Sequence, residues 1–220
     1  MARMANEASS REEILRRVRA ATGGASTEEV ARAAWRAVLR QYKREGERRR
    51  ELVLELFENR LRDYDATVVR CEPGNVAQSV AVMLSERGKR RVVVPEGLAA
   101  EWLPINFEFV IDKGLTATVL DGFDGVLTGS SVAIAETGTV ILQNVPGQGR
   151  RSATLVPDYY LCLVRAEDLV ETVPEAINRL RVTSSLATTF VSGPSATADI
   201  EMTRIKGVHG PRHLDVILIT

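Results

Sequence analysis

The spacing of apolar side chains changes character near Ala66. Before this residue, apolar positions recur at intervals of three and four, which is typical of amphipathic helices. Capping boxes at residues 10–13 and 26–29 each begin a helical segment. Residues 43–51 are almost all charged, and helical spacing resumes at residues 52–61. The second segment is therefore either two helices or one long helix with a solvated middle, packed across the rim of the next domain.

From Ala66 onwards, β-branched and aromatic runs alternate with helical segments. The first strand–helix–strand unit predicts a parallel pair with a right-handed crossover. Glu136-Thr137-Gly138 joins two β-rich runs, so we expect a hairpin or sharp bend there, with Gly138 at positive φ. Predicted strands are 66–71, 91–94, 117–120, two runs within 126–142, 159–164, 187–191 and 214–219, and predicted helices are 75–87 and 166–181.

The bulk composition fits a single sizeable α/β domain with a short appendage. The chain has 220 residues, of which 45% are hydrophobic. We place the helical N-terminal region at residues 1–62 and the α/β domain at 63–220. With 29 basic and 29 acidic residues, the formal net charge is zero, which favours neither nucleic acid nor an anionic membrane as a partner.

Two further features indicate a cytoplasmic location and no metal cluster. No stretch approaches the ~18 apolar residues of a membrane span, and the N-terminus lacks the apolar core of a signal peptide. Cys71 and Cys162 each lie in an apolar, strand-like run, which favours buried free thiols over a disulfide. Two cysteines are too few for an ordinary iron–sulfur cluster, and we expect this chain to bind no cofactor.

A stretch near the C-terminus has the pattern of a strand, a tight turn and a helix start. The strand 187–191 is followed by Gly193 and a proline, and Ser195 or Thr197 is suited to cap a new helix. The N–H groups at a helix start attract an anion, which is either a ligand or the nearby carboxylate of Asp199. Both alternatives stay open at this point.

Three loops rich in glycine, hydroxyl and amide groups are candidates for a shared crevice. They are residues 128–131, 136–139 and 148–152. If they meet at the carboxyl ends of parallel strands, they form a polar crevice of the kind that binds small anions or nucleotides. Arg150 and Arg151 are then suited to clamp a carboxylate or phosphate. The alternative is ordinary turn chemistry with solvated arginines.

Two side chains are candidates for acid–base or covalent work. Glu136 is the carboxylate inside an otherwise apolar and hydroxyl-rich run. Burial there would raise its pKa and suit it to acid–base or covalent chemistry. A carboxylate that accepts hydrogen bonds from nearby backbone amides fits the same pattern. His209 lies between Gly207 and Gly210 and is suited to act as a general base or a ligand. A structural or merely exposed histidine fits this position equally well.

Several of these motifs together resemble one known family. Residues 134–139 (Ile-Ala-Glu-Thr-Gly-Thr), 146–150 (Pro-Gly-Gln-Gly-Arg), 192–201 and 207–212 look like the LutC/YkgG family of lactate utilization proteins, which carry the LUD domain. The resemblance covers roughly residues 66–220 in the same motif order.

The resemblance implies a fold similar to the NagB/RpiA/CoA-transferase-like α/β fold, with a mostly parallel central sheet flanked by helices and a helical N-terminal appendage. It also implies a role in oxidising L-lactate to pyruvate beside two partner proteins that carry the iron–sulfur clusters. A small carboxylate or phosphate-like anion is the implied ligand, and a homodimer is left open.

The sequence and the resemblance together define one set of candidate site residues. Glu136 and His209 are the candidate catalytic groups. The candidate ligand-binding residues are Thr128, Gly129, Thr137, Gly138, Gln148, Arg150, Ser192, Gly193, Ser195 and Asp199.

Two other functions fit the sequence. One is a stand-alone enzyme that handles acyl groups or sugar phosphates, with Glu136 as nucleophile or base, an expectation that comes from fold analogy. The other is a binding or regulatory module whose N-terminal helices, rich in arginine and glutamate, dock a partner.

Overall fold

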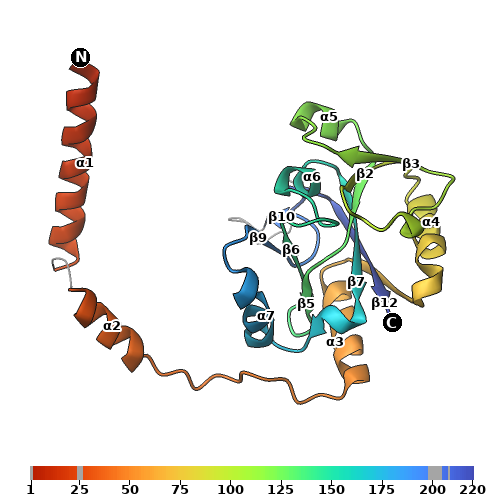
Figure 1. The fold of residues 1–220 in the computed structure, drawn as a ribbon, viewed down its shortest axis with the longest axis horizontal. Coiled ribbons are helices and arrows are strands. Elements are labelled where there is room, and N and C mark those ends of the chain that lie inside the picture. The colour runs from red at the N-terminus through yellow and green to blue at the C-terminus, as the bar shows by residue number, and fades with distance from the viewer. Residues whose placement is uncertain (1, 24–26, 198–204, 208) are drawn as a thin grey trace. The chain divides into compact units, whose positions relative to one another are not determined.

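The computed structural model describes all residues except 1, 24–26, 198–204 and 208, and divides into two compact units, 1–42 and 43–220 (Figure 1). The first unit contains α1 (Ala2–Ala21) and α2 (Glu28–Ala37). The hydroxyl of Thr27 accepts a hydrogen bond from the N–H of Val30, so α2 is capped one residue later than the box predicted at residues 26–29. The helix predicted to begin at the box 10–13 begins instead at Ala2. No side chain of α2 is buried within this unit. In the described part of the chain, none of the helices has the length and apolar content to span a bilayer.

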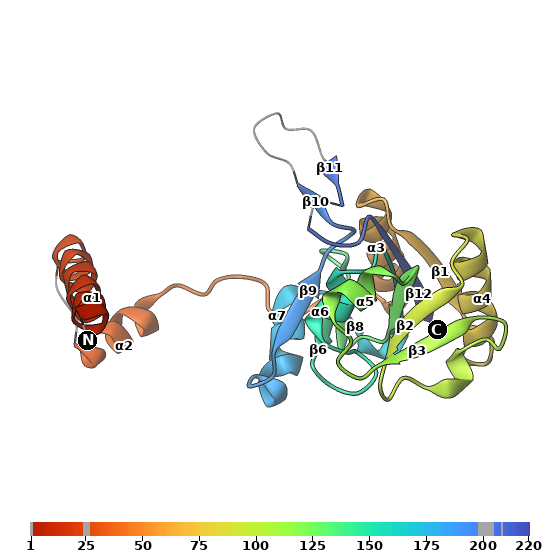
Figure 2. The ribbon, with the colours of Figure 1, turned by 90° about the horizontal axis from the view of Figure 1, so that it is seen from above.

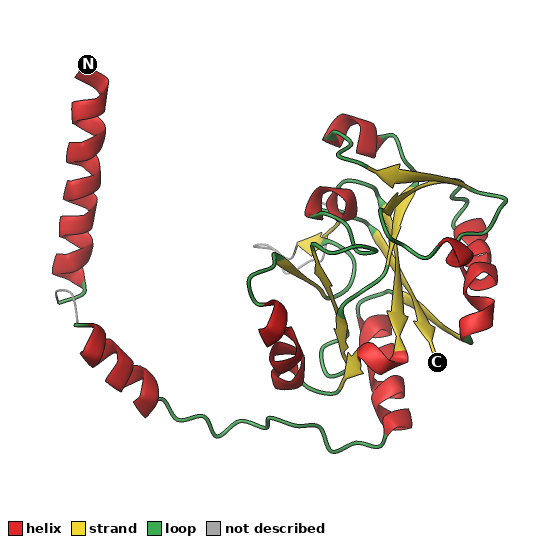
Figure 3. Cartoon of the chain, in the orientation of Figure 1, coloured by secondary structure: helices red, strands yellow, loops and turns green. Residues whose placement is uncertain are grey.

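The second unit is built on a parallel sheet (Figure 3). Within the described residues six strands pair in the order β1-β12-β7-β4-β2-β3, and every pairing is parallel. The strands are β1 (Thr67–Cys71), β2 (Arg91–Pro95), β3 (Glu108–Asp112), β4 (Gly125–Thr128), β7 (Tyr159–Arg165) and β12 (His213–Ile219). The predicted α/β fold with a mostly parallel central sheet is confirmed.

Each face of this sheet is covered by a different set of elements. On one face, α4 (Val76–Glu86) buries Val80 and Leu84 against β2 and β12. On the other face, α3 (Arg50–Asp63) buries Phe57 and Leu61. This second face also carries α5 (Ala117–Asp121), α6 (Arg151–Leu155) and a smaller sheet. Figure 2 shows α4 and α7 on opposite sides of the central sheet.

The smaller sheet forms an additional layer. Its order is β8-β5-β6-β9, with β5 (Val132–Ile134) and β6 (Thr139–Gln143) joined as the predicted hairpin. Gly138 has φ 57°, which confirms the expected left-handed turn residue. The other strands are β8 (Leu169–Val170) and β9 (Thr188–Val191), and α7 (Val173–Arg179) packs on the outer face.

Three predicted elements differ from the structure. The strands of the first strand–helix–strand unit, β1 and β2, share a sheet but are not neighbours, because β12, β7 and β4 lie between them. Residues 117–120 are helical because the hydroxyl of Thr116 caps α5. The predicted helix 166–181 begins with a turn and then β8, since β8 pairs with β5 before α7 starts.

A helix start capped by Ser195, one of the two predicted caps, is also wrong. Ala196–Thr197 forms β10, which pairs antiparallel with β11 (Ile205–Lys206). The anion site proposed at a helix start capped by Ser195 is therefore not present, whereas a start capped by Thr197 would fall on residues 198–204, which lie outside the described residues. Asp199 lies outside the described residues. The short 3-10 helices are η1 (Pro73–Asn75), η2 (Ala100–Trp102), η3 (Ala166–Asp168) and η4 (Leu180–Thr183).

Candidate functional site

A cavity of about 260 Å³ lies over the amino ends of β7 and β12, and we call it the Ser192–His209 cavity. Tyr160 and Leu214 form part of its lining, and they are register partners on these two strands. The wall is completed by α6 and by the segments 190–196 and 209–211. The polar side chains that line it are Arg151, Thr154, Tyr160, Ser192, Ser195 and His209.

Two hydrogen bonds, one of them to the Ser195 hydroxyl, hold the two wall segments together. The N–H of Ser195 donates to the carbonyl of Pro211 over 2.9 Å, and Ser195 Oγ accepts the N–H of His209 over 3.2 Å. Gly193 has φ 82°, and a Cβ there would lie 2.5 Å from Cβ of Tyr64. A side chain at position 193 would therefore displace the turn. The predicted residues Ser192, Gly193, Ser195 and His209 do meet at one cavity.

Arg151 supplies the cation of this cavity. Across the described part of the chain its guanidinium forms no ion pair, and its hydrogen bonding is limited to a 3.4 Å contact from Nη1 to Oγ1 of Thr154. None of the described residues that line the cavity is acidic. A guanidinium with open N–H groups can bind a carboxylate or phosphate through two parallel hydrogen bonds.

Arg150, the predicted clamp, has a different role. It donates through Nε and Nη2 to both carboxylate oxygens of Asp112, over 2.7 and 2.8 Å, and through Nη2 to the carbonyl of Leu115. Burial works to raise the pKa of Asp112, but hydrogen bonds from Arg150, Leu115 and Gly114 outweigh it and lower this pKa. The N–H groups of the Arg150 guanidinium are therefore used within the fold, where they join the start of α6 to the end of β3.

Thr128 and Tyr160 connect the cavity to the core. The hydroxyl of Thr128 lies 2.8 Å from the hydroxyl of Tyr160 and donates to the carbonyl of Gly129. Thr128 is fully buried, so its hydroxyl serves the core rather than a ligand. Burial also raises the pKa of the nearby Cys162 thiol to about 11. Both cysteines are buried free thiols, as predicted.

The hairpin residues Thr137 and Gly138 lie beside the cavity rather than in it. The hydroxyls of Thr137 and Thr139 are 2.7 Å apart, and that of Thr139 is 2.7 Å from the hydroxyl of Ser192. This chain of hydroxyls links the hairpin to the cavity wall. Gly138 allows α3 to pack closely, because a Cβ at this position would lie 2.8 Å from Cβ of Arg60.

Gly129 and Gln148 line a second hollow, which we call the carboxyl-edge crevice. It measures about 320 Å³ and lies at the carboxyl ends of β2, β4 and β7. Arg150 lines a third hollow beside Pro95 and Asp112. The structure thus divides the predicted ligand-binding residues among separate places, and the expectation of one shared crevice is not met.

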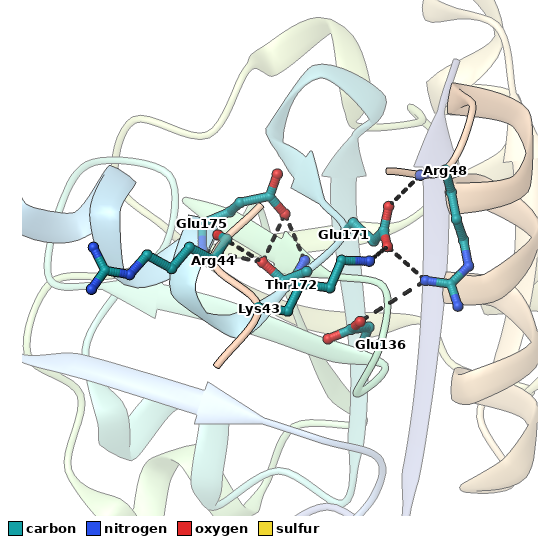
Figure 4. Close-up of polar contacts among 7 residues, drawn as sticks. All are labelled: Lys43, Arg44, Arg48, Glu136, Glu171, Thr172 and Glu175. Atoms are coloured by element: carbon teal, nitrogen blue, oxygen red, sulfur yellow. Dashed lines mark hydrogen bonds and ion pairs between the residues drawn. The ribbon is translucent and has the colours of Figure 1, made fainter. Parts of the chain in front are cut away.

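Glu136 belongs to a polar cluster around Glu171, shown in Figure 4. Glu136 Oε1 lies 3.9 Å from Nη1 of Arg48, and the N–H of Glu136 donates to the carbonyl of Glu171. The side chain of Glu171 is only 3% exposed. It accepts hydrogen bonds from Lys43 Nζ at 3.1 Å, Arg48 Nη1 at 2.6 Å and the N–H of Arg48 at 2.8 Å.

These bonds fasten the extended segment 43–49, which we call the strap, across the end of β8. Burial works to raise the pKa of Glu171, but the Arg48 N–H bond and the cations of Lys43 and Arg48 lower it. Thr172 adds a bond from Oγ1 to the carbonyl of Arg44, and with Glu175 it forms the capping box of α7. The sequence analysis did not identify Glu171 as a buried, paired residue. The signal that could have found it is the charged run 43–51, whose cations need carboxylate partners wherever the run packs on the domain.

The comparisons with known proteins agree with this fold. A family model described as "LUD domain" matches residues 111–219, which include every described residue lining the Ser192–His209 cavity. "Lactate utilization protein C" of Deinococcus radiodurans is 41% identical over 170 residues, covering 76% of this chain and 79% of that protein. "Lactate utilization protein C" of Bacillus subtilis is 35% identical over 100 residues, or 43% of this chain and 41% of that protein.

A solved structure supports the same assignment. The crystal structure of a DUF162 family protein from Deinococcus radiodurans matches with a TM-score of 0.70 and 37% sequence identity. The match covers 79% of this chain and 100% of that chain. The family resemblance that the sequence motifs indicated is thereby confirmed, and it extends over most of the α/β unit. The chain belongs to the LUD-domain family of lactate utilization C proteins.

Proposed function

We propose that this chain acts in lactate utilization, as the subunit without iron–sulfur clusters in an assembly that oxidises L-lactate to pyruvate. The Ser192–His209 cavity holds the small carboxylate. Family membership supports the role in lactate utilization. The observation that carries the ligand class is the Arg151 guanidinium, which lines a cavity without acidic side chains among its described residues.

The cavity suits a small 2-hydroxy or 2-oxo acid in size and chemistry. A volume of about 260 Å³ is small compared with the pockets of drug-sized ligands, which measure roughly 300–1,000 Å³. Arg151 pairs with the carboxylate, and the hydroxyls of Ser192 and Ser195 are placed to bond the oxygen on the adjacent carbon. Leu214 offers an apolar surface to the methyl group. His209 lines the same cavity and is the candidate for proton transfer.

The electron-transfer part of the reaction is assigned to the partners. The two cysteines of this chain are too few for an ordinary iron–sulfur cluster, and both are buried. Two partner proteins that carry clusters would therefore take the electrons released when lactate becomes pyruvate. This chain binds and orients the organic acid.

Binding of L-lactate and pyruvate to the purified chain tests the proposal. Arg151→Gln should weaken pyruvate binding roughly tenfold or more, because charge-assisted hydrogen bonds to a carboxylate are lost. The matched control is Arg181→Gln, since Arg181 is exposed and lies outside the cavity. Equal affinities of the Arg151→Gln variant and the unaltered chain would contradict the assignment of the cavity.

A second experiment tests the role in the assembly. Lactate oxidation is measured with this chain present, omitted, or replaced by Arg151→Gln. We expect oxidation to fall in both altered mixtures. Unchanged oxidation when the chain is omitted would contradict the proposed subunit role, whatever the cavity binds.

The N-terminal unit favours an additional role in docking. On α2, Val30 is 58% exposed and lies opposite Glu28 and Arg32 on the helix. Trp35 is 70% exposed and lies next to Glu28, with the Arg40 guanidinium 4.6 Å from its ring centroid. An amphipathic helix with no buried residue within its own unit suits the groove of a partner, here a cluster-carrying protein. Replacing Val30 and Trp35 by serine should weaken association in a pull-down. Retained association would contradict this role.

A further inference from the structure

The carboxyl-edge crevice lies where the direction of the chain reverses within the parallel sheet. From β2 the chain continues outward to β3, whereas the next strand of this sheet after β4 is β7, on the opposite side. Neighbouring strands whose connections run in opposite directions leave a crevice outside their carboxyl ends, and open α/β sheets bind ligands there. Gly97 and Trp102 after β2, Gly129 and Ser130 after β4, and Arg165 and Asp168 at the end of β7 line it.

Hydrogen bonds keep the loops of this crevice in place. The N–H of Gly147 donates to the carbonyl of Glu96 over 2.8 Å, and the carbonyl of Gly147 accepts the N–H of Gly129 over 2.8 Å. Gly147 therefore joins the loop after β2 to the loop after β4. The crevice is formed without the need for a ligand to order it.

Gln148 presents an unused hydrogen-bond donor to this crevice. Its Oε1 accepts the backbone N–H of Gln143 over 2.7 Å and the hydroxyl of Ser131 over 2.8 Å. Since a backbone N–H can only donate, the amide orientation is determined, and Nε2 points away from these two groups. Gln148 is 8% exposed, and its hydrogen bonds to described residues all go through Oε1. Since no buried side-chain nitrogen or oxygen in the described ranges lacks a partner, Nε2 is accessible to solvent.

Asp168 presents an unused acceptor at the same crevice. It is half-buried, and among the described residues its carboxylate makes no hydrogen bond or ion pair. Burial, followed by the charge of Glu167, raises its pKa. Arg165 lies over the Trp102 ring, 5.2 Å from its centroid, and 3.5 Å from Glu167. Arg179, which donates to the carbonyl of Glu167, also acts on the charge of Asp168, so two carboxylates are balanced by two guanidinium groups and the crevice suits a neutral ligand.

We propose that the carboxyl-edge crevice binds a neutral ligand with neighbouring hydroxyl groups, such as the ribose of a nucleoside. Gln148 Nε2 donates a hydrogen bond to one hydroxyl oxygen, and the Asp168 carboxylate accepts a hydrogen bond from the other hydroxyl. A hydroxyl group both donates and accepts, so it satisfies this pair of groups where an inorganic anion does not. The crevice is a second site, separate in place and charge from the Ser192–His209 cavity.

NMR titration of the full chain tests the proposal, with adenosine as the probe and 2′-deoxyadenosine as its matched control. We expect adenosine to shift the side-chain NH₂ signals of Gln148 and the indole signal of Trp102. The deoxynucleoside should bind roughly tenfold more weakly, and inorganic phosphate should leave these signals unchanged. Absence of adenosine shifts, equal binding of the two nucleosides, or phosphate shifts at Gln148 would each overturn the proposal.

Two variants identify the groups that recognise the ligand. Gln148→Glu keeps the oxygen that bonds Gln143 and Ser131 but removes the donor, and Asp168→Asn keeps the size of the side chain but removes the charge. Each should weaken adenosine binding roughly tenfold, whereas Glu72→Gln, at an exposed position, should not. Pyruvate binding should be unchanged in both, which separates failure here from failure of the proposed function. Unaltered adenosine binding in folded Asp168→Asn would overturn the assignment.

Discussion

The Glu171 cluster and the Ser192–His209 cavity both hold charged side chains, but they differ in how far those charges are satisfied. Glu171 is buried and accepts three hydrogen bonds, two of them from cations (Figure 4). Arg151 faces its cavity with one long contact to Thr154. A buried charge whose hydrogen bonds are all made within the protein stabilises the fold. A charge whose hydrogen-bonding groups are mostly unused can bind a ligand. Substitutions in the two regions should therefore affect different measurements.

The largest expected effect on stability is at Glu171. Glu171→Ala should lower the free energy of unfolding by about 3 kcal/mol, because the buried attachment of the strap is lost. Chemical denaturation measures this change. Glu47→Ala is the matched control in the strap, since Glu47 is exposed, and it should stay within about 0.5 kcal/mol. Equal effects of the two substitutions would contradict the structural role of Glu171.

The contribution of Glu171 to stability should also depend on pH. Because the pKa of Glu171 is lowered in the folded state, its contribution is fully present above the unfolded value of about 4.3. It is lost as the pH falls through the lower folded value. The difference in stability between the unaltered chain and Glu171→Gln should therefore shrink as the pH falls below about 4. A difference that grows on acidification would have the wrong sign.

A methyl group at Gly46 should have a smaller effect. A Cβ at this position would lie 2.5 Å from Cβ of Glu171, whose side chain is held by Lys43 and Arg48. Gly46→Ala should cost about 1–3 kcal/mol of unfolding free energy through this overlap. The double variant with Glu171→Gly removes Cβ as well as the carboxylate, and with them the obstacle, so the effects of Gly46→Ala and Glu171→Gly should not add. Full additivity would show that the strap passes elsewhere.

Glu136 provides a finer test of the same cluster. Its side chain is 38% exposed and its ion pair with Arg48 is long at 3.9 Å, so Glu136→Ala should cost less than about 1 kcal/mol. Turnover of the lactate-oxidising assembly should also be unchanged, because Glu136 lines neither the Ser192–His209 cavity nor the carboxyl-edge crevice. A large loss of turnover with unchanged stability would restore Glu136 as a catalytic candidate.

The smallest effect on stability is expected at Arg151. Arg151→Gln should change the free energy of unfolding by less than about 0.5 kcal/mol, since the guanidinium has no ion pair within the described residues to lose. Its effect should appear in pyruvate binding instead. If Arg151→Gln destabilised the chain as much as Glu171→Ala does, the distinction between the two regions would be wrong.

Local sequence patterns predicted the elements whose signals are local. The hairpin around Gly138 followed from a glycine between two β-rich runs, and strands β7 and β12 followed from continuous apolar runs. The pattern failed at residues 117–120, where a helical cap at Thr116 outweighed the β-branched composition. It failed again at β8, because two residues became a strand only through pairing with β5.

The sequence by itself determined the fold class, the family motifs and the residue types available for binding a small acid. Only the tertiary structure decided which of two adjacent arginines meets a ligand. Arg150 precedes α6 and turns to Asp112 at the end of β3, whereas Arg151 begins the helix and lines the Ser192–His209 cavity. The physical reason is that spacing along the chain sets local conformation, but the partner of each charge depends on strands and helices brought together from distant parts of the chain.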